Sequence, residues 1–350
     1  MKICYFGMYD KNYSRNRVII RGLAENGHEV LECQSQATGF KKYGELIRQH
    51  RQLKGRYDLM MVGFPGQTVM PLAKMLCRTK IIFDAFSSHY GGYIEDRGYH
   101  RKFSLMALNY WLWDWFSVML ADVVLLDTQA HIDYFSRLLK ISPARFKRIF
   151  VSSDDKVFFP QTKKQPEEKF IVYFHGTYIP LQGVEYIIEA ASLLKSESDI
   201  EFRLLGKGQT FKKVQGQSEK FKTGNVKFFN PAKYEELPGY MAQADVILGI
   251  FGLTKKAGYV IPNKVYEALA MKKPVITRKS KALEELLTDR ENVLLANPGD
   301  PRDLADKILE LKKYKELRIK IEENGYQLFK EKLTPKKVVK GMIDELRIKN

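Results

Sequence analysis

The sequence predicts an α/β protein with two doubly wound domains, each built on a parallel sheet, facing each other across a cleft. Short apolar segments, each long enough for one strand, alternate with longer segments of helical periodicity along most of the chain. The apolar segments show little polar alternation, which is typical of parallel strands buried on both faces. The alternation begins again at Phe170 after a polar stretch, so the pattern occurs twice. Ligands of such domains bind at the carboxyl ends of the strands.

The first domain begins with an apolar segment that ends at Gly7 and is predicted as a strand. A helix follows, with Val18, Ile19, Leu23 and Ala24 on one face, and it ends at the turn around Gly27. Further strands are predicted at 29–33, 59–62, 81–83 and 123–126. Helical stretches separate them, as in a doubly wound fold.

The second domain repeats the alternation. Its predicted strands are 170–174, 201–205, 226–229, 246–249 and 274–277, and its predicted helices are 183–195, 234–242 and 263–271. The last stretch, from Asp303, has a helical pattern with Lys and Glu at i,i+4 spacings, which predicts a packing role. We therefore expect an N-terminal domain at 1–160, a linker at 161–169, a second domain at 170–330, and a C-terminal helix at 331–350 that packs back on the first domain.

The segment 103–126 contains Trp111, Trp113 and Trp115 and follows Arg97, Arg101 and Lys102. It has the composition of a membrane-interface segment. Asn109, Asp114 and Asp122 interrupt it, and we interpret it as a buried helix of the first domain, with membrane contact as the alternative.

The chain has 350 residues and a formal net charge of +17, with 45% hydrophobic and 28% charged residues, which is a globular composition. The charge predicts an anionic partner, but no basic stripe with interleaved aromatics or nucleic-acid-reading module is present, so nucleic acid is not expected. An anionic membrane surface remains an open alternative to general surface basicity. Cys4, Cys33 and Cys77 lack the spacing of a disulfide framework or zinc site. The N-terminus lacks a signal-peptide core, and we expect a cytoplasmic protein.

Each predicted domain has a glycine where its first strand meets its first helix, namely Gly7 and Gly176, and a third glycine, Gly206, ends another strand in LLGKG. Glycine at this place lets backbone amides and a helix N-terminus approach a phosphate. The alternative is a tight turn with no ligand. The sequence has no GxGxxG, GxxxxGK[ST] or HExxH motif and no Asp-x-Asp pair, so we expect neither a dinucleotide cofactor nor a divalent metal. Lysines such as Lys264 and Lys207 would then meet the charge of a diphosphate.

An ordered series of motifs resembles the family 4 retaining glycosyltransferases, which have the GT-B fold of two Rossmann-like domains. The series covers nearly the whole chain: GHEV (27–30), FHGTYIPLQGVEYIIEAASLLK (174–195), LLGKG (204–208), NVKFF (225–229), ADVILGIF (244–251), IPNKVYEALAMKKPVIT (261–277) and RENVLLANPGD (290–300). The resemblance implies that the second domain binds a nucleotide-diphosphate sugar.

The resemblance also implies roles for single residues. Glu267 would accept hydrogen bonds from the nucleotide ribose, and Pro262, Asn263 and Lys264 would line the diphosphate. Gly7, Gly176, Gly206 and Lys207 complete the expected donor site. Where many members have a glutamate that contacts the donor sugar, this chain has Tyr259, and in the turn where many have Arg and Lys it has Thr177 and Gln182.

In the first domain, DAFSSHY (84–90) resembles the place where the family presents a histidine to the donor sugar. His89 would then contact that sugar or position the acceptor, and the alternative is a surface loop histidine. LLDTQAH (125–131) resembles a strand-to-helix turn, so Asp127 and Thr128 are expected to cap a helix and, with Asp84, to face the acceptor. His175 is expected to bond the turn backbone.

The resemblance implies a metal-independent, retaining glycosyltransferase that uses a nucleotide-diphosphate sugar and a glycan or lipid-linked glycan as acceptor. It would work in the cytoplasm, with the inner membrane face as an alternative location. Two other functions remain open: a GT-B sugar-nucleotide epimerase, and a non-catalytic protein that binds a sugar nucleotide.

Overall fold

The computed structural model describes residues 1–162 and 168–347. The chain forms two compact units: unit 1 contains Met1–Asp154 and the C-terminal segment from Leu333, and unit 2 contains Asp155–Lys332. The division falls before the linker expected at 161–169, of which residues 163–167 lie outside the described part of the chain. Phe158 explains the earlier division, because it is fully buried and its ring lies 5.0 Å from that of Tyr234 in unit 2.

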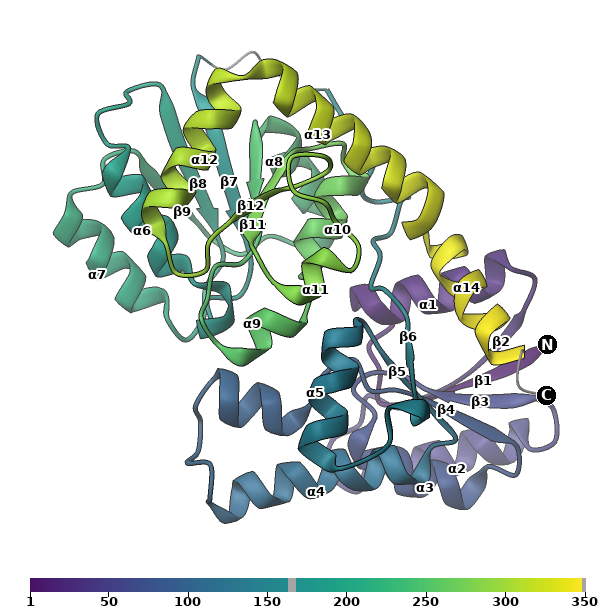
Figure 1. The fold of residues 1–350 in the computed structure, drawn as a ribbon. Coiled ribbons are helices and arrows are strands. Elements are labelled where there is room, and N and C mark those ends of the chain that lie inside the picture. The colour runs from purple at the N-terminus through teal and green to yellow at the C-terminus, as the bar shows by residue number, and fades with distance from the viewer. Residues whose placement is uncertain (163–167, 348–350) are drawn as a thin grey trace. The chain divides into compact units, whose positions relative to one another are not determined.

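Unit 1 is built on a six-stranded sheet in the order β2-β1-β3-β4-β5-β6, in which every printed pairing is parallel. Its strands are β1 Lys2–Gly7, β2 Glu29–Gln34, β3 Leu59–Val62, β4 Lys80–Asp84, β5 Val123–Leu126 and β6 Phe146–Arg148. Its α-helices are α1 Ser14–Glu25, α2 Lys41–Leu53, α3 Met70–Leu76, α4 Leu105–Leu120, α5 Gln129–Leu139 and α14 Pro335–Arg347 (Figure 1). All four residues of β3 are buried, as expected for a parallel strand covered on both faces.

The last helix, α14, packs against α1 within unit 1. Gly22 of α1 makes this close approach feasible, because a Cβ atom there would lie 2.5 Å from Cγ2 of Val339. Val338, Val339 and Met342 are buried on the packed face of α14. The helix therefore completes the core of unit 1, although the whole of unit 2, Asp155–Lys332, separates it in sequence from the rest of that unit.

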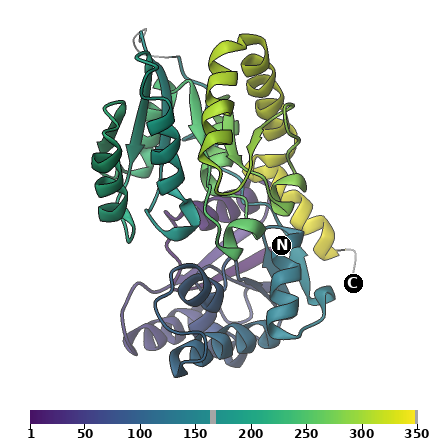
Figure 2. The ribbon, with the colours of Figure 1, turned by 60° about the vertical axis from the view of Figure 1, so that its left-hand side comes forward.

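Unit 2 has a second six-stranded sheet in the order β12-β11-β10-β7-β8-β9, again parallel in every printed pairing. Its strands are β7 Phe170–His175, β8 Ile200–Leu205, β9 Val226–Phe229, β10 Val246–Leu248, β11 Val275–Arg278 and β12 Leu294–Ala296. Its α-helices are α6 Val184–Leu193, α7 Phe211–Phe221, α8 Leu237–Gln243, α9 Lys255–Tyr259, α10 Asn263–Ala270, α11 Lys281–Glu284, α12 Pro301–Lys313 and α13 Lys315–Leu328. The neighbouring helices α12 and α13 stand side by side at the top of Figure 2.

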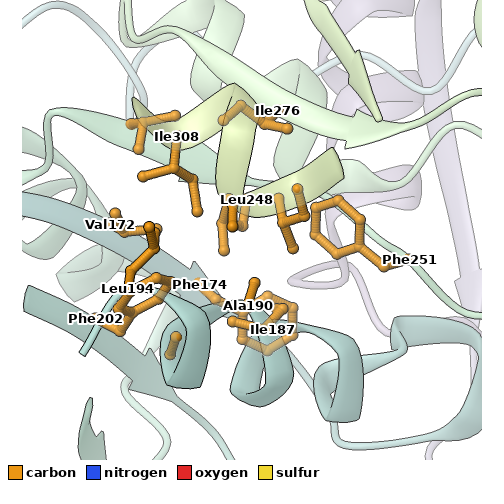
Figure 3. Packing of buried hydrophobic residues seen from close by; sticks show 14 of the residues in the cluster. Val172, Phe174, Ile187, Ala190, Leu194, Phe202, Leu248, Phe251, Ile276 and Ile308 are labelled. Atoms are coloured by element: carbon orange, nitrogen blue, oxygen red, sulfur yellow. The ribbon is translucent and has the colours of Figure 1, made fainter. Parts of the chain in front are cut away.

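One hydrophobic cluster of unit 2 lies between one face of its sheet and the helices α6 and α12. Figure 3 shows Ile187 and Ala190 of α6 and Ile308 of α12 beside strand residues such as Val172 and Leu248. These five side chains are fully buried. Truncating one of the larger side chains among them to alanine is expected to cost about 2–5 kcal/mol of stability, because buried apolar contacts are lost and a cavity remains.

Most of the strands lie where the sequence predicts them, but some elements were not predicted. Strands β6 and β12 and helix α7 were not among the expected elements. Strands β6 and β12 contain three residues each. The helical pattern after Asp303 is not one helix: α12, α13 and α14 are separate helices, and a π-helical turn at Phe329–Leu333 precedes α14.

The interpretation of segment 103–126 as a buried helix is only partly correct for α4. Its residues Ala107, Asp114, Ser117 and Val118 are buried against unit 1, but a second face made of large apolar residues is exposed to solvent. The helix is apolar on the face that packs against unit 1 and also on the face that is exposed. The amino-acid composition alone could not show which of its apolar residues are exposed.

Candidate functional site

The sheet of unit 2 reverses its strand order between β7 and β10. From β7 the chain proceeds to β8 and β9 on one side, and β10, β11 and β12 follow on the other side. Connections that leave two neighbouring strands in opposite directions create a crevice at their carboxyl ends, where α/β proteins bind ligands. The segments that follow β7 and β10, which begin at Gly176 and Gly249, therefore form the candidate site.

Two of the predicted glycines make this crevice sterically possible. Gly176 has φ +154° and Gly206, after β8, has φ +136°, a region that side-chain-bearing residues rarely adopt. A Cβ atom on Gly206 would collide with the carbonyl group of Gly176, and one on Gly176 would lie 3.0 Å from Nζ of Lys264. Glycine therefore lets these two loops touch and keeps the space beside the lysine open.

Lys264 is the second residue of α10, and its side chain is buried at this crevice with 4% exposure. Its Nζ donates to Oε1 of Gln182 at 2.5 Å and to the carbonyl oxygen of Gly249 at 3.5 Å. It also lies 3.7 Å from the centroid of the Phe174 ring. No carboxylate of the described residues forms an ion pair with it. Burial lowers the pKa of Lys264 well below its ordinary value, although the negative charge of Glu267 opposes this shift.

Glu267 lies one turn further along α10 and is also buried. Its Oε2 accepts a hydrogen bond from Nε2 of His175 at 2.9 Å, with that nitrogen protonated. His175 therefore bonds the Glu267 carboxylate, and the expected bond to the turn backbone is replaced by this contact. The pair brings together the last residue of β7 and the middle of α10.

A cavity of about 210 Å³ opens beside this pair at the ends of β7 and β8. Its lining includes His175, Gly176, Thr177, Gly206, Lys207, Pro231 and Leu237. Nδ1 of His175 and the hydroxyl of Tyr173 are buried and have no hydrogen-bond partner in the described chain. Buried polar atoms usually have partners, so these two atoms mark a place where a ligand or water would complete the structure.

The other predicted donor residues lie at the same end of unit 2. Lys207 is exposed at the rim of the cavity. Pro262 is the N-cap residue of α10 and Asn263 is its first residue. Pro262 provides no capping hydrogen bond, whereas Thr254, Ser280 and Asp300 cap the neighbouring helices α9, α11 and α12 with their side chains. The first turn of α10 therefore has no capping side chain beside the buried lysine.

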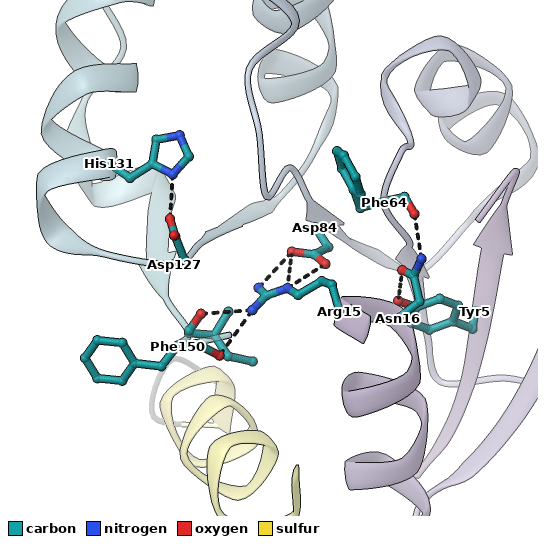
Figure 4. Close-up of polar contacts among 9 residues, drawn as sticks. Tyr5, Arg15, Asn16, Phe64, Asp84, Asp127, His131 and Phe150 are labelled. Atoms are coloured by element: carbon teal, nitrogen blue, oxygen red, sulfur yellow. Dashed lines mark hydrogen bonds and ion pairs between the residues drawn. The ribbon is translucent and has the colours of Figure 1, made fainter. Parts of the chain in front are cut away.

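In unit 1, Gly7 has φ +137° at the end of β1, and the predicted acceptor residue Asp84 lies at the end of β4. Asp84 is fully buried, and both of its carboxylate oxygens accept hydrogen bonds from Arg15, at 2.9 to 3.3 Å (Figure 4). Arg15 also donates to the carbonyl oxygens of Ile149 and Phe150. Asp84 is thus an internal counter-ion, and the predicted acceptor contact does not fit its complete burial.

Thr128 caps α5 as predicted, because its hydroxyl accepts a hydrogen bond from the backbone amide of His131 at 3.0 Å. Asp127 is not a cap. Its Oδ1 lies 2.5 Å from Nδ1 of His131, and both side chains are buried (Figure 4). This contact ties the end of β5 to the first turn of α5.

His89 lies in the segment that joins β4 to α4, and burial lowers its pKa to about 4, so the ring is neutral at neutral pH. Asp114 of α4 fixes this segment: its carboxylate accepts from the hydroxyl of Ser88 at 2.6 Å and from the amides of His89 and Tyr90 at 2.9 and 3.0 Å. The position of His89 therefore depends on a carboxylate that is 25 residues away in sequence.

Three partners at these sites were not predicted from the sequence: Gln182 as the acceptor for Lys264, Arg15 as the partner of Asp84, and Asp114 as the anchor of His89. The only available signal was an isolated polar residue in an apolar segment, as for Asp114 within α4. The partners themselves come from other strands and helices, so no local spacing could reveal them.

Known proteins resemble the part of the chain that contains this site. Residues 155–328 match the family model described as Glycosyl transferases group 1. An uncharacterized glycosyltransferase of Methanocaldococcus jannaschii is 30% identical over 169 residues, which cover 48% of this chain and 45% of that relative. The chain thus matches less than half of the length of the curated relatives found.

Solved structures extend the similarity to both units. The sucrose-phosphate synthase of Thermosynechococcus elongatus superimposes with a TM-score of 0.78 at 16% identity, covering 99% of this chain and 98% of that one. Anabaena HepE, solved in complex with UDP and glucose, gives a TM-score of 0.74 at 16% identity, covering 99% and 100%. At such identity the likeness concerns the fold, which is GT-B. Taken together, these findings show that the chain has the GT-B fold, and that its residues 155–328 match the family model described as Glycosyl transferases group 1.

Proposed function

We propose that this protein is a retaining, metal-independent glycosyltransferase that moves a sugar from a nucleotide-diphosphate sugar to a glycan or lipid-linked glycan. The observation that carries the proposal is the buried Lys264 amine, whose hydrogen-bond acceptors among the described residues are two neutral oxygens at the crevice of unit 2. A diphosphate beside it would supply the missing counter-charge and would restore the protonated form of the amine.

The remaining groups of unit 2 fit the parts of such a donor. The backbone at Gly176 and Gly206 is open to close approach by phosphate oxygens, and the first turn of α10, with Pro262 and Asn263, carries a positive partial charge. Glu267 would accept hydrogen bonds from the ribose. The cavity next to His175 would hold another part of the nucleotide. HepE, a structural neighbour, was solved with UDP-glucose, so uridine is the first base to test.

In the proposed reaction the bond between C1 of the sugar and the diphosphate oxygen breaks, and the acceptor hydroxyl oxygen bonds to C1 on the same face. The acceptor proton goes to the departing diphosphate. Lys264, Lys207 and the α10 N-terminus would stabilise the charge that develops there, and the neutral ring of His89 would contact the sugar or position the acceptor. The site would thus act by positioning and by electrostatics.

The proposal places the enzyme in the cytoplasm, at the inner face of the membrane, in the synthesis of an envelope polysaccharide. Among the described residues no helix is long and apolar enough to cross a bilayer. A lipid-linked acceptor would therefore be met at the membrane surface.

The test is UDP binding by isothermal titration calorimetry in the presence of EDTA, with the wild type, Glu267→Gln and Glu284→Gln. The amide oxygen that Glu267→Gln introduces could still accept from His175, so the fold should be kept, but the charge-assisted ribose contact would be lost. We expect binding to weaken about 10- to 100-fold in Glu267→Gln. Glu284 is an exposed glutamate of α11 that is not part of the lining of the cavity beside His175, so its variant should bind as the wild type does.

Failure of the wild type to bind any nucleoside diphosphate would contradict the donor site. The products separate the remaining functions. Slow hydrolysis of the donor without acceptor, and an NMR spectrum of the product with unchanged anomeric configuration, would support retaining transfer. A changed configuration of the free sugar nucleotide would indicate an epimerase, and binding without any turnover would indicate a non-catalytic protein.

A further inference from the structure

The exposed face of α4 carries a continuous row of large apolar side chains. Leu105, Leu108, Leu112, Phe116 and Met119 are 85%, 53%, 36%, 48% and 42% exposed. Their spacing of three or four residues places them on one side of the helix. Scattered exposed hydrophobic residues are normal, but a row along a 16-residue helix forms a patch.

This row contains no charge. The one ionisable acid of α4, Asp114, is buried and bonded to Ser88 and to the amides of His89 and Tyr90. Among the exposed positions of the helix, Asn109 is the only polar side chain. A water-facing helix normally presents charged residues, so the face is built for an apolar environment.

Basic and aromatic residues stand at the N-terminal end of the row. Between Tyr99 and Phe103, which are 50% and 101% exposed, the exposed residues include Arg101 and Lys102. The guanidinium of Arg97 lies 5.8 Å from the centroid of the Tyr99 ring. Exposed aromatic residues next to cations are typical of segments at the headgroup level of a bilayer.

A second basic group lies where α4 ends and the chain enters β5. A hollow of about 410 Å³ there is lined by Lys74, Arg78, Lys80 and Asp122, together with Cys77 and Thr79. The only acid in the lining, Asp122, accepts a hydrogen bond from the backbone amide of Ile81 at 2.7 Å. Helix α3, which provides Lys74, packs against α4, and both lie at the lower edge of Figure 1. The apolar row is thus flanked by cations at both ends.

We propose that this surface, made of the α4 row and its two basic ends, docks on an anionic lipid bilayer. The apolar row would enter the boundary between headgroups and acyl chains, and the cations would meet lipid phosphates. A second copy of the chain fits less well, because pairing two such surfaces would bring like charges together. The proposal does not depend on sugar transfer, because membrane binding requires no nucleotide.

The experiment is co-sedimentation of the full chain with vesicles, without any nucleotide. We expect the wild type to bind vesicles of phosphatidylglycerol mixed with phosphatidylcholine and to remain in solution with phosphatidylcholine alone. Leu108→Glu/Phe116→Glu should reduce binding at least about tenfold, because two inserted apolar groups are replaced by anions. Arg101→Gln/Lys102→Gln should weaken binding less, and added salt should weaken it in the wild type.

The matched control is Leu193→Glu/Ile319→Glu, which adds the same charge at two exposed apolar positions of unit 2, 48% and 44% exposed. It should bind vesicles nearly as the wild type does. Thermal melts and UDP titrations of each variant show whether the fold and the donor site are intact, so loss of vesicle binding with both retained supports the docking surface.

Three results would overturn the proposal: no preference of the wild type for anionic vesicles, equal loss of binding in the control variant, or retained binding in Leu108→Glu/Phe116→Glu. Self-association is the other use of this surface. It would be indicated if the wild type does not bind vesicles, light scattering shows that the wild type is a dimer, and Leu108→Glu/Phe116→Glu is a monomer.

Discussion

Arg15 and Lys264 make a natural comparison between the two units. Each is the second residue of a helix near the carboxyl ends of a parallel sheet, and each side chain is at most 4% exposed. Arg15 has a carboxylate partner in Asp84, with Nη2 at 2.9 Å from Oδ1. Within the described part of the chain, Lys264 donates instead to the neutral oxygens of Gln182 and Gly249. One cation is therefore neutralised within its unit, and the other is not.

The difference in pKa follows from these partners. Burial disfavours the charge of both groups, but Asp84 outweighs burial and raises the pKa of Arg15, whereas burial dominates for Lys264 and lowers its pKa. A buried cation with a carboxylate partner is a structural element. A buried cation without a carboxylate partner is a candidate for binding an anion. The presence or absence of that partner, and not the choice of Arg or Lys, distinguishes the two units.

The largest expected effect comes from breaking the neutralised pair. Asp84→Asn leaves the Arg15 guanidinium buried and unpaired, which should destabilise unit 1 by about 3–5 kcal/mol. Lys264→Met is the matched variant in unit 2, and it should leave the ligand-free stability unchanged or higher. Hydrogen exchange measured by mass spectrometry reports on α1 and α10 separately. If α1 in Asp84→Asn and α10 in Lys264→Met lose protection against hydrogen exchange to a similar extent, the two cations do not differ in their structural role.

A smaller but more specific effect concerns the proton on Lys264. UDP binding at pH 8 should take up a fraction of a proton, because the diphosphate restores the charge of an amine whose pKa burial has lowered. Calorimetry in buffers with different ionisation enthalpies measures this uptake. Uridine, which lacks phosphates, should show none, and Lys264→Arg should lose the uptake because a guanidinium stays protonated. Phosphate-dependent binding without proton uptake would mean that the amine is already charged.

The smallest expected effect is a pH dependence of stability caused by Asp114, a buried carboxyl group that has hydrogen-bond donors but no cationic partner among the described residues. Burial raises the pKa of Asp114 from 3.8 to about 6, although hydrogen bonds from Ser88, Tyr90 and His89 oppose the shift. A raised folded-state pKa contributes stability that is complete below the unfolded pKa and is lost as pH rises through the folded pKa.

We therefore expect the wild type to gain stability relative to Asp114→Asn as the pH falls from 7 to 4, by at most about 3 kcal/mol. Urea unfolding of both proteins across this range measures the difference. A constant difference would show that Asp114 titrates alike in the folded and unfolded chains.

The sequence predicted the fold well because the parallel strands are short apolar runs between helical stretches. The segments 59–62, 123–126 and 226–229 coincide with β3, β5 and β9. It predicted the glycine turns for the same reason, since the positive φ of Gly176 and Gly206 is a local property. Strands β6 and β12 were not predicted, although β10, which has the same length of three residues, was.

The partners within the candidate site could not be predicted in the same way. His175 and Glu267 are 92 residues apart, and Lys264 and Gln182 are 82 residues apart. Such pairs depend on how strands are ordered in the sheet, which single-sequence periodicity does not determine. The outward face of α4 was missed for a different reason: an apolar helix has the same composition whether its second side meets protein, lipid or water.

Because α14 belongs to unit 1, the two units cannot both be produced as simple fragments of the chain. In chain order unit 2 is an insertion, since it occupies Asp155–Lys332 between the two segments of unit 1. Residues 155–332 form one contiguous fragment and could be produced alone. A fragment of residues 1–154 would lack α14 and would expose the face of α1 at Gly22 that α14 covers, so unit 1 requires its C-terminal segment joined back to residue 154 by a short linker.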